Sequence, residues 1–466
     1  MQKYKYLLKN VGLLTISNFG TKILSFLLIP IYTSILSTAD YGLYDIYSTT
    51  VSLLIPLLTL NIVEGVMRFS LDKGKEAPMV FSIGFKIVFK AGVILTVLAT
   101  INRVFGIIPV FKQYWIFLIL LFWGSTVYDL LSQFSRGIER IADVAVAGAI
   151  NSVTMLALNV LFLVRFRFGL WGYFAANCCA YYAPIVYYIF RLKIWKYVIF
   201  KENKPLQSEM SSYSTPLVFN TVAWWINNVS DRYIVTWMAG VAANGVYSVS
   251  YKIPSILNIF QSIFSQAWTL SAVKEFNDGN EFYSKVYRVY NCGMVMVCSC
   301  LILADRIVAR ILFSGDFFTA WKYAPFLMIS VVFGAMSGML GGIFSASKDS
   351  TIFAKTTLIG AAINTVLNVV LVYMMGPLGA AISTEVAYVF VWSARYRAAN
   401  KIVEVKTRIK RDAFSYVVLN VQAVLWLISQ SAMMYIVQVV FVGGLLLIYI
   451  DDIKEAVVPV IKKVKE

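Results

Sequence analysis

Histidine is absent from this chain of 466 residues, so no imidazole is available for metal binding or general-base catalysis. The five cysteines lie in apolar stretches without the spacing of a metal site or a disulfide framework, which favours packing roles for them. Charged residues make up only 14% of the chain. Soluble domains carry about 25%, and this scarcity therefore excludes an ordinary soluble protein.

A phosphate-binding loop of the Gly-x-x-x-x-Gly-Lys-Ser/Thr type is also missing, as is any loop long enough to hold a soluble catalytic domain. ATP hydrolysis by this chain is therefore not expected, and neither is a metal centre or an organic cofactor. These absences favour a protein that makes and breaks no covalent bond.

Hydrophobic residues are plentiful at 59%, and aromatic residues reach 15%, with Tyr and Trp near the ends of apolar stretches as in interfacial belts. A membrane-spanning helix needs roughly 20 apolar residues, so the sequence predicts an all-α polytopic membrane protein of about fourteen spans. The predicted spans are 11–36, 43–70, 79–101, 114–135, 142–164, 169–190, 214–238, 242–271, 288–311, 323–346, 353–375, 377–394, 413–430 and 433–450.

The formal net charge is +17. The basic residues are spread over many short loops instead of one folded face, which excludes nucleic acid as a partner. The loops on the side of the two termini hold most of the loop Lys and Arg, including the run from Arg395 to Arg411. The positive-inside rule then places both termini in the cytosol.

Short motifs recur in the same order at an offset of about 200 residues, which indicates an internal repeat. The repeat predicts two pseudo-symmetric six-helix lobes, 1–190 and 214–399, followed by two helices in 413–450. We expect a basic cytosolic linker at 191–213, a basic cytosolic loop at 400–412 and a cytosolic tail at 451–466. The matched motifs are Gly42-Leu43-Tyr44 with Gly245-Val246-Tyr247, Asn151 with Asn364, Asn159 with Asn368, and Gly169-Leu170-Trp171-Gly172 with Gly376-Pro377-Leu378-Gly379.

Basic side chains within or at the edges of the predicted spans are the most informative feature. Cations are costly in hydrocarbon and normally face a bundle interior or a watery cavity. Their number predicts a cavity for an anionic amphiphile, although pairing with acids and snorkelling to the interface remain alternatives. These residues are Lys22, Arg68, Lys86, Lys90, Arg232, Lys252 and Arg306.

Two predicted helices of the first lobe carry polar stripes. Asn18 lies one turn before Lys22, and an ion pair with another helix is the structural alternative for this lysine. Asn61, Glu64 and Arg68 share one face at spacings of three and four residues. Glu64 and Arg68 have the spacing of an ion pair, and Glu64 is a candidate for ion exchange.

The corresponding helices of the second lobe are similar. Asn220, Asn227 and Asp231 lie on one stripe, with Asn228 and Arg232 beside it. Asp231 is a second candidate for ion exchange, with neutralisation of a neighbouring cation as the alternative. Lys252 follows on the next helix, close to Pro254, which favours a kink.

Lys86 and Lys90, one turn apart, either line the cytosolic entrance of the cavity or contact lipid headgroups. Other acids also lie within predicted spans. We expect Asp305 to pair with Arg306, and we expect a structural role for Glu385, while Asp129 has no assigned role.

The opening run resembles the start of bacterial polysaccharide repeat-unit flippases, a branch of the multidrug/oligosaccharidyl-lipid/polysaccharide exporter superfamily that includes MATE-like exporters. The residues that carry the resemblance are Asn18-Phe19-Gly20, Pro30, Tyr32-Thr33, Tyr41-Gly42-x-Tyr44, and Glu64 to Arg68.

The resemblance implies a V-shaped pair of bundles that moves undecaprenyl-pyrophosphate-linked oligosaccharides to the outer leaflet of the bacterial cytoplasmic membrane by alternating access. Lys22, Arg68, Arg232 and Lys252 would then hold the pyrophosphate, and Asn18, Asn61, Asn220, Asn227 and Asn228 the sugars. H+ or Na+ would couple at Glu64 or Asp231, and glycosyltransferases and a polysaccharide polymerase would be partners. A MATE-type cation antiporter and a non-transporting scaffold of a glycan-assembly complex are the alternatives.

Overall fold

Helices dominate the computed structural model, and no strand occurs within the residues that it describes, which are 26–72, 76–199, 201–274, 280–347 and 350–455. The chain divides into two compact units, Met1–Trp225 and Ile226–Glu466, whose boundary falls inside one long helix. The predicted all-α class is confirmed. The predicted domain boundaries at 190 and 214 stay predictions.

The first unit follows the predicted order of spans, and its last helix continues into the second unit. Its elements are α2 (Ile29–Ile35), α3 (Thr38–Thr59), α4 (Ile62–Ser70), α5 (Ala77–Phe105), η1 (Pro109–Phe111), α6 (Trp115–Gly137), α7 (Ile141–Asn159), η2 (Val160–Arg165), α8 (Gly169–Leu192), η3 (Ile194–Lys196) and the N-terminal part of α9 (Lys204–Ala239).

The second unit begins in the last turns of α9. Its further elements are α10 (Val241–Ser250), α11 (Pro254–Lys274), α12 (Asn280–Leu312), η4 (Gly315–Lys322), α13 (Ala324–Ala346), α14 (Ser350–Met375), α15 (Pro377–Ala399), α16 (Ile409–Ile428) and α17 (Ala432–Ile448).

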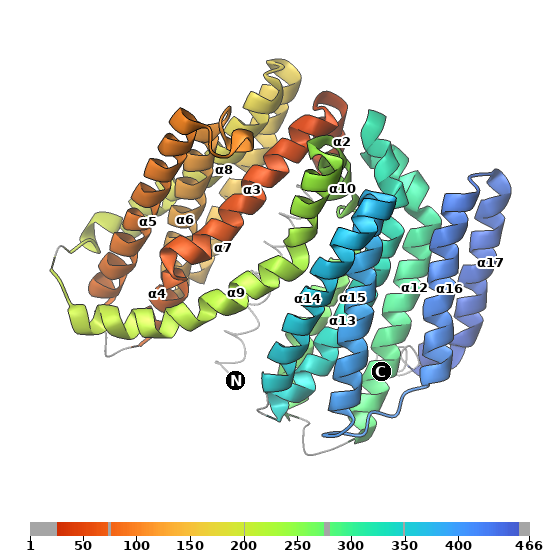
Figure 1. Cartoon of the computed structure of the whole chain (residues 1–466). Helices are drawn as coiled ribbons and strands as arrows, with labels where there is room; N and C mark the ends of the chain where they lie inside the picture. The colour runs from red at the N-terminus through yellow and green to blue at the C-terminus, as the bar shows by residue number, and fades with distance from the viewer. Residues whose placement is uncertain (1–25, 73–75, 200, 275–279, 348–349, 456–466) are drawn as a thin grey trace, which may run out of the picture. The chain divides into compact units, whose positions relative to one another are not determined.

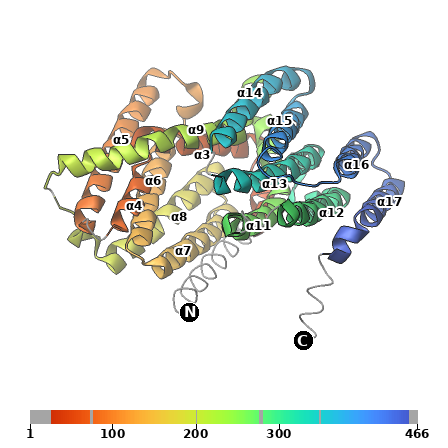
Figure 2. The same ribbon diagram turned by 90° about the horizontal axis from the view of Figure 1, so that it is seen from below.

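The internal repeat is visible in how each unit packs. In the first unit α6 contacts α4, α5 and α8, and α7 packs on α8. In the second unit α13 contacts α11, α12 and α15 in the same way, and α14 packs on α15. Within the residues that the structure describes, α16 and α17 have no counterpart in the first unit. Both pack on α12, as Figures 1 and 2 show.

By length and composition alone, six helices of the described residues are able to cross a membrane, or seven if α3 and α4 count as one bent span. The remaining long helices of the described residues, α8, α9, α11, α15 and α16, are less apolar by this measure. This multi-pass architecture makes the chain a membrane protein.

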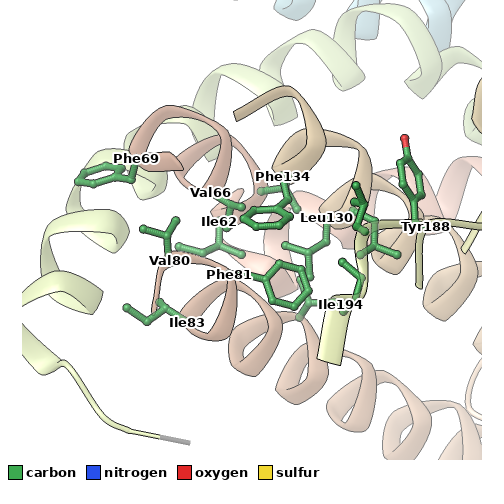
Figure 3. Packing of buried hydrophobic residues seen from close by; sticks show 14 of the residues in the cluster. Ile62, Val66, Phe69, Val80, Phe81, Ile83, Leu130, Phe134, Tyr188 and Ile194 are labelled. Carbon is green, nitrogen blue, oxygen red and sulfur yellow. The ribbon is translucent and has the colours of Figure 1, made fainter. Parts of the chain in front are cut away.

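The core of the first unit packs apolar side chains from α4, α5, α6, α8 and η3 against one another (Figure 3). Val66, Phe81 and Phe134 are at most 1% exposed and lie on three different helices. Burying side chains of this size contributes about 1.5–3 kcal/mol each. This core fixes the positions of α4 and α6, which carry the polar residues described below.

The predicted span 43–70 is broken. Leu60 and Asn61 both take left-handed backbone conformations, with φ of 53° and 52°, and α3 and α4 meet at 62°. Asparagine tolerates this conformation better than most residues. The break turns the side chain of Asn61 toward α9, where its Nδ2 donates to Oγ1 of Thr221 at 2.8 Å.

The helix α9 begins ten residues before the predicted span 214–238 and takes up the end of the predicted linker. Its first turns are polar on one side only. Leu206 and Met210, 6% and 0% exposed, join the core of the first unit on the other side. A hydropathy pattern misses such a turn because two buried side chains in ten residues do not form an apolar run.

The repeated Gly-x-x-Gly motif allows a sharp turn followed by a close helix contact in both units. Gly376, with φ of +61°, lets the chain turn sharply between α14 and α15. Three residues later, Gly379 lies against the backbone of Leu371 on α14, where a Cβ would overlap with the carbonyl. Gly169 and Gly172 serve the same purposes between η2 and α8.

Replacing Gly379 with alanine is expected to destabilise the second unit by about 1–3 kcal/mol or more, because backbone atoms cannot move aside as a side chain can. Thermal unfolding followed by size-exclusion chromatography in detergent measures this. Gly443→Ala is the matched control, since a Cβ on this glycine of α17 meets no atom within 4 Å. Equal melting temperatures for both variants would contradict the account.

Candidate functional site

A polar cavity of about 570 Å³ lies within the first unit, between α3, α4, α6 and the N-terminal half of α9. Its volume falls in the usual range for small-molecule sites, about 300–1,000 Å³. It is lined by Ser52, Ile55, Pro56, Asn61, Val63, Glu64, Asp129, Gln133, Leu217, Asn220 and Thr221. Three of the predicted site residues, Asn61, Glu64 and Asn220, therefore come together at one cavity.

Hydrogen bonds between helices hold this cavity in shape. The Nε2 atom of Gln133 on α6 donates to Oε1 of Glu64 on α4 at 3.0 Å. The indole of Trp225 on α9 donates to the carbonyl of Thr49 and to Oγ of Ser52 on α3, at 3.1 and 3.0 Å. Lipid cannot form hydrogen bonds with these polar groups. Hydrogen bonds between the helices satisfy them instead and fix their positions.

The charge of the cavity differs from the charge that the sequence suggested for the substrate site. Among the described residues that line it, two carboxylic acids occur, Glu64 and Asp129, and no Lys or Arg. Amide and hydroxyl oxygens of Asn61, Asn220 and Thr221 accompany them. Such a set of oxygen atoms suits a proton or a hard cation and repels a phosphate.

Arg68 lies in the last turn of α4, and its side chain is exposed. The ion pair that the spacing of Glu64 and Arg68 allows is not formed. Glu64 accepts a hydrogen bond from Gln133, and Arg68 has no ion-pair partner in the part of the chain that the structure describes. Asn18 and Lys22 lie outside the described residues.

In the second unit, Asp231 is the centre of a buried network. It is 2% exposed, and its Oδ2 accepts hydrogen bonds from the hydroxyls of Tyr247 and Tyr251 at 2.6 and 2.5 Å. Its Oδ1 accepts from the backbone N–H of Arg232 at 2.9 Å. Both carboxyl oxygens are thus already engaged within the unit, and ion exchange at Asp231 stays a prediction.

Arg232 and Lys252 lie close to this network. The guanidinium of Arg232 lies 5.2 Å from the ring centroid of Tyr251, within cation–π range. Lys252 lies in the three-residue break between α10 and α11, and Pro254 begins the second of these helices. The predicted kink at Pro254 is confirmed as a break. Two of the four predicted phosphate ligands therefore come from neighbouring segments of one unit.

The two predicted asparagines of α9 in this unit contact other helices. The backbone carbonyl of Asn227 accepts from Nδ2 of Asn364 on α14 at 3.3 Å. The Oδ1 atom of Asn228 accepts from the hydroxyl of Tyr388 on α15 at 3.0 Å. These bonds fix α9 against α14 and α15.

Asp305 and Arg306 do not form the expected pair. Arg306 donates to the backbone carbonyl and Oε1 of Gln430 at 3.0 and 3.1 Å, and it lies over the rings of Trp321 and Trp426. Asp305 points into the core of the unit, fully buried, with no hydrogen-bond partner among the described residues. Neighbours in sequence on a helix point in directions about 100° apart, which explains the error.

Sequence analysis missed Gln133 and Thr221, and it gave Asp129 no role. Asp129 and Gln133 are four residues apart on α6, a spacing that places both on one face. This signal was available in the sequence. Thr221 had no such signal, because its role depends on the break at Asn61, a residue 160 positions away.

Comparisons with solved structures identify the fold of this chain. The fold is similar to that of the lipid II flippase MurJ in an inward closed conformation, with a TM-score of 0.68 and 13% identity. The match covers 95% of this chain and 99% of MurJ. It also matches 95% of an inward-facing multidrug resistance MATE family transporter of the MOP superfamily over 82% of the chain, with a TM-score of 0.65 and 15% identity. The chain therefore has the fold of the MOP transporter superfamily, as predicted.

The family model described as polysaccharide biosynthesis protein matches residues 7–270, more than half of the chain. The chain belongs to this family. An uncharacterised membrane protein of Methanocaldococcus jannaschii is 23% identical over 274 residues, which are 53% of each chain, so the match spans about half the length of this curated relative. The predicted fold and family are therefore confirmed, and the role as a transporter remains a proposal.

Proposed function

We propose that this protein moves undecaprenyl-pyrophosphate-linked oligosaccharides from the cytosolic to the outer leaflet of a bacterial cytoplasmic membrane, with both termini in the cytosol. The observation that carries the proposal is the match to a polysaccharide biosynthesis family over residues 7–270 in a chain with a transporter fold. A transporter in such a biosynthesis has an obvious cargo, the lipid-linked glycan that must cross the bilayer.

The residues proposed to hold the pyrophosphate are Lys22, Arg68, Arg232 and Lys252. Charge-assisted hydrogen bonds from ammonium and guanidinium groups to phosphate oxygens are roughly twice as strong as neutral ones. The amides of Asn18, Asn61, Asn220, Asn227 and Asn228 are proposed to line the path of the sugars. The polyprenyl tail stays in the lipid, along α16 and α17.

We propose the acid-lined cavity of the first unit as the ion-coupling site, with H+ or Na+ bound between Glu64 and Asp129. The carboxyl of Glu64 accepts a hydrogen bond from Gln133 through Oε1, the one such bond to it among the residues that the structure describes. A cation in this cavity neutralises two acids that otherwise repel each other. Its release on the other side of the membrane would drive the alternation.

Replacing Glu64 with glutamine is expected to remove the ion dependence of transport, because the amide keeps the size but loses the titratable charge. The measurement is transport in vesicles with and without a pH or sodium gradient. Glu139→Gln is the control, since this acid is exposed in the turn between α6 and α7. An unchanged gradient dependence in Glu64→Gln would exclude this residue.

A second candidate function, a MATE-type cation antiporter, is favoured by the same cavity, which carries carboxylates and no cation among its described lining residues. The two candidate functions predict different effects when a cell loses the protein. Loss of an antiporter raises sensitivity to organic cations and leaves glycan export intact.

The test is deletion of the gene in its own bacterium. Accumulation of lipid-linked repeat units with unchanged sensitivity to organic cations is the expected result. Normal levels of these intermediates together with cation hypersensitivity would overturn the proposal in favour of the antiporter. Partner glycosyltransferases and a polysaccharide polymerase are proposed to act before and after this step.

A further inference from the structure

A second charged cavity lies in the first unit, on the surface between α5 and the start of α9. It measures about 370 Å³, and every described residue that lines it is polar. Lys86 and Lys90 come from α5, one turn apart. The remaining lining residues, from the segment before α9 and from its first turns, are Glu202, Lys204, Gln207, Ser208 and Ser211.

Three ammonium groups face a single carboxylate in this cavity. Glu202 accepts from Nζ of Lys86 at 2.7 Å. The hydrogen bond and charge of Lys86, followed by the charges of Lys204 and Lys90, hold the pKa of the Glu202 carboxyl below its ordinary value. Lys90 and Lys204 have no ion-pair partner among the residues that the structure describes. The cavity is therefore short of negative charge.

The one ion pair in the cavity is weak. The side chains of Lys86 and Glu202 are 44% and 60% exposed, and solvated pairs of this kind contribute little to stability. Glu202 precedes α9 in the connecting segment and is not part of the helix. A ligand with two or more negative charges can displace this carboxylate, because it interacts with all three lysines while Glu202 interacts strongly with one.

The surroundings of the cavity indicate where such a ligand comes from. The helix α5 is long and apolar enough to cross a membrane. Its face beyond Lys90 continues with Val93 and Val97, which are 43% and 52% exposed. Two lysines followed by exposed valines on one helix are complementary to an amphiphile. Its anionic head would lie at the lysines and its acyl or prenyl chain along the valines.

We propose that this cavity binds the phosphate or diphosphate head of a membrane lipid, with Glu202 as a counter-ion that the lipid displaces. Lysine suits this role, since its compact ammonium acts as a point charge on phosphate oxygens. The hydroxyls of Ser208 and Ser211 supply neutral donors from α9. The proposal concerns binding and stands whether or not the proposed function is correct.

The experiment measures the Kd of the full-length protein in detergent for a short-chain polyprenyl diphosphate. The double variant Lys86→Ala/Lys90→Ala is expected to bind about tenfold more weakly, since it loses two charge-assisted contacts. Lys112→Ala/Lys196→Ala is the control, because both of these lysines are exposed and lie outside the cavity. Equal weakening in both double variants would reduce the effect to net charge and overturn the proposal.

Glu202→Gln separates the proposal from a purely structural ion pair. Removal of a displaceable counter-ion is expected to tighten binding by about threefold. Weaker or unchanged binding would contradict the role of Glu202. Inorganic pyrophosphate is the second probe, and an affinity equal to that of the polyprenyl compound would overturn the assignment of a lipid, since the chain would then add nothing.

Discussion

Cells that carry Arg232→Ala are expected to lose glycan export almost completely while the protein remains folded in the membrane. Arg232 is one of the proposed phosphate ligands, and removing one partner of a desolvated charged contact costs about 2–5 kcal/mol. Such a loss lowers the rate by about thirtyfold or more. The measurement is surface glycan in a deletion strain complemented with each variant.

Two controls separate loss of binding from loss of structure. Arg232→Lys keeps the charge but not the planar guanidinium, and partial export is expected from it. Size-exclusion chromatography reports on folding, because Arg232 also lies over Tyr251 and next to the buried Asp231. Lys22→Ala is expected to match Arg232→Ala. Full export by both alanine variants would contradict the proposed cargo.

Replacing Arg411 with alanine is expected to destabilise the attachment of α16 and α17 by about 3–5 kcal/mol, since it removes the cation that donates to two buried carboxylates. Arg411 donates to Oδ1 of Asp412 at 3.0 Å and also to Asp452, and these acids are 0% and 1% exposed. The hydroxyl of Tyr449 donates to the same Oδ1 of Asp412 at 3.2 Å. A large fall in melting temperature is the expected readout.

A neighbouring ion pair provides the matched control. Arg408, directly before α16, and Asp451, shortly after α17, approach to 3.7 Å, but their side chains are 52% and 70% exposed. Exposed pairs contribute about 0–1 kcal/mol, so Arg408→Ala is expected to leave the melting temperature nearly unchanged. Similar losses in Arg408→Ala and Arg411→Ala would show that burial of the network is not what stabilises it.

Sequence alone predicted most of the helices because their ends are marked locally. Gly376 and Pro377 stop α14 and start α15, and the same turn recurs at Gly169. The break between α3 and α4 was not predicted, because the apolar pattern runs through Leu60 without interruption. What stabilises the break, the contact of Asn61 with Thr221, joins residues that are distant in the chain.

The candidate site was likewise predicted only in part from the sequence. Polar residues inside apolar helices identified Asn61, Glu64 and Asn220, because such residues have to face protein or water. Their partner Gln133 belongs to another helix, and no pattern within one segment shows which helices are neighbours. Convergence of the cations from both halves stays a prediction, with Arg68 in one unit and Arg232 and Lys252 in the other.

The most direct test of the central claim uses purified protein in liposomes that contain a fluorescent lipid-linked oligosaccharide. A glycan-cleaving enzyme added outside reaches only the outer leaflet, so the fraction of substrate cleaved reports movement across the bilayer. Cleavage of nearly all the substrate with the unaltered protein, and of only the outer half with Arg232→Ala, is the predicted result. Cleavage that stops at the outer half with the unaltered protein, as in empty liposomes, would contradict the account.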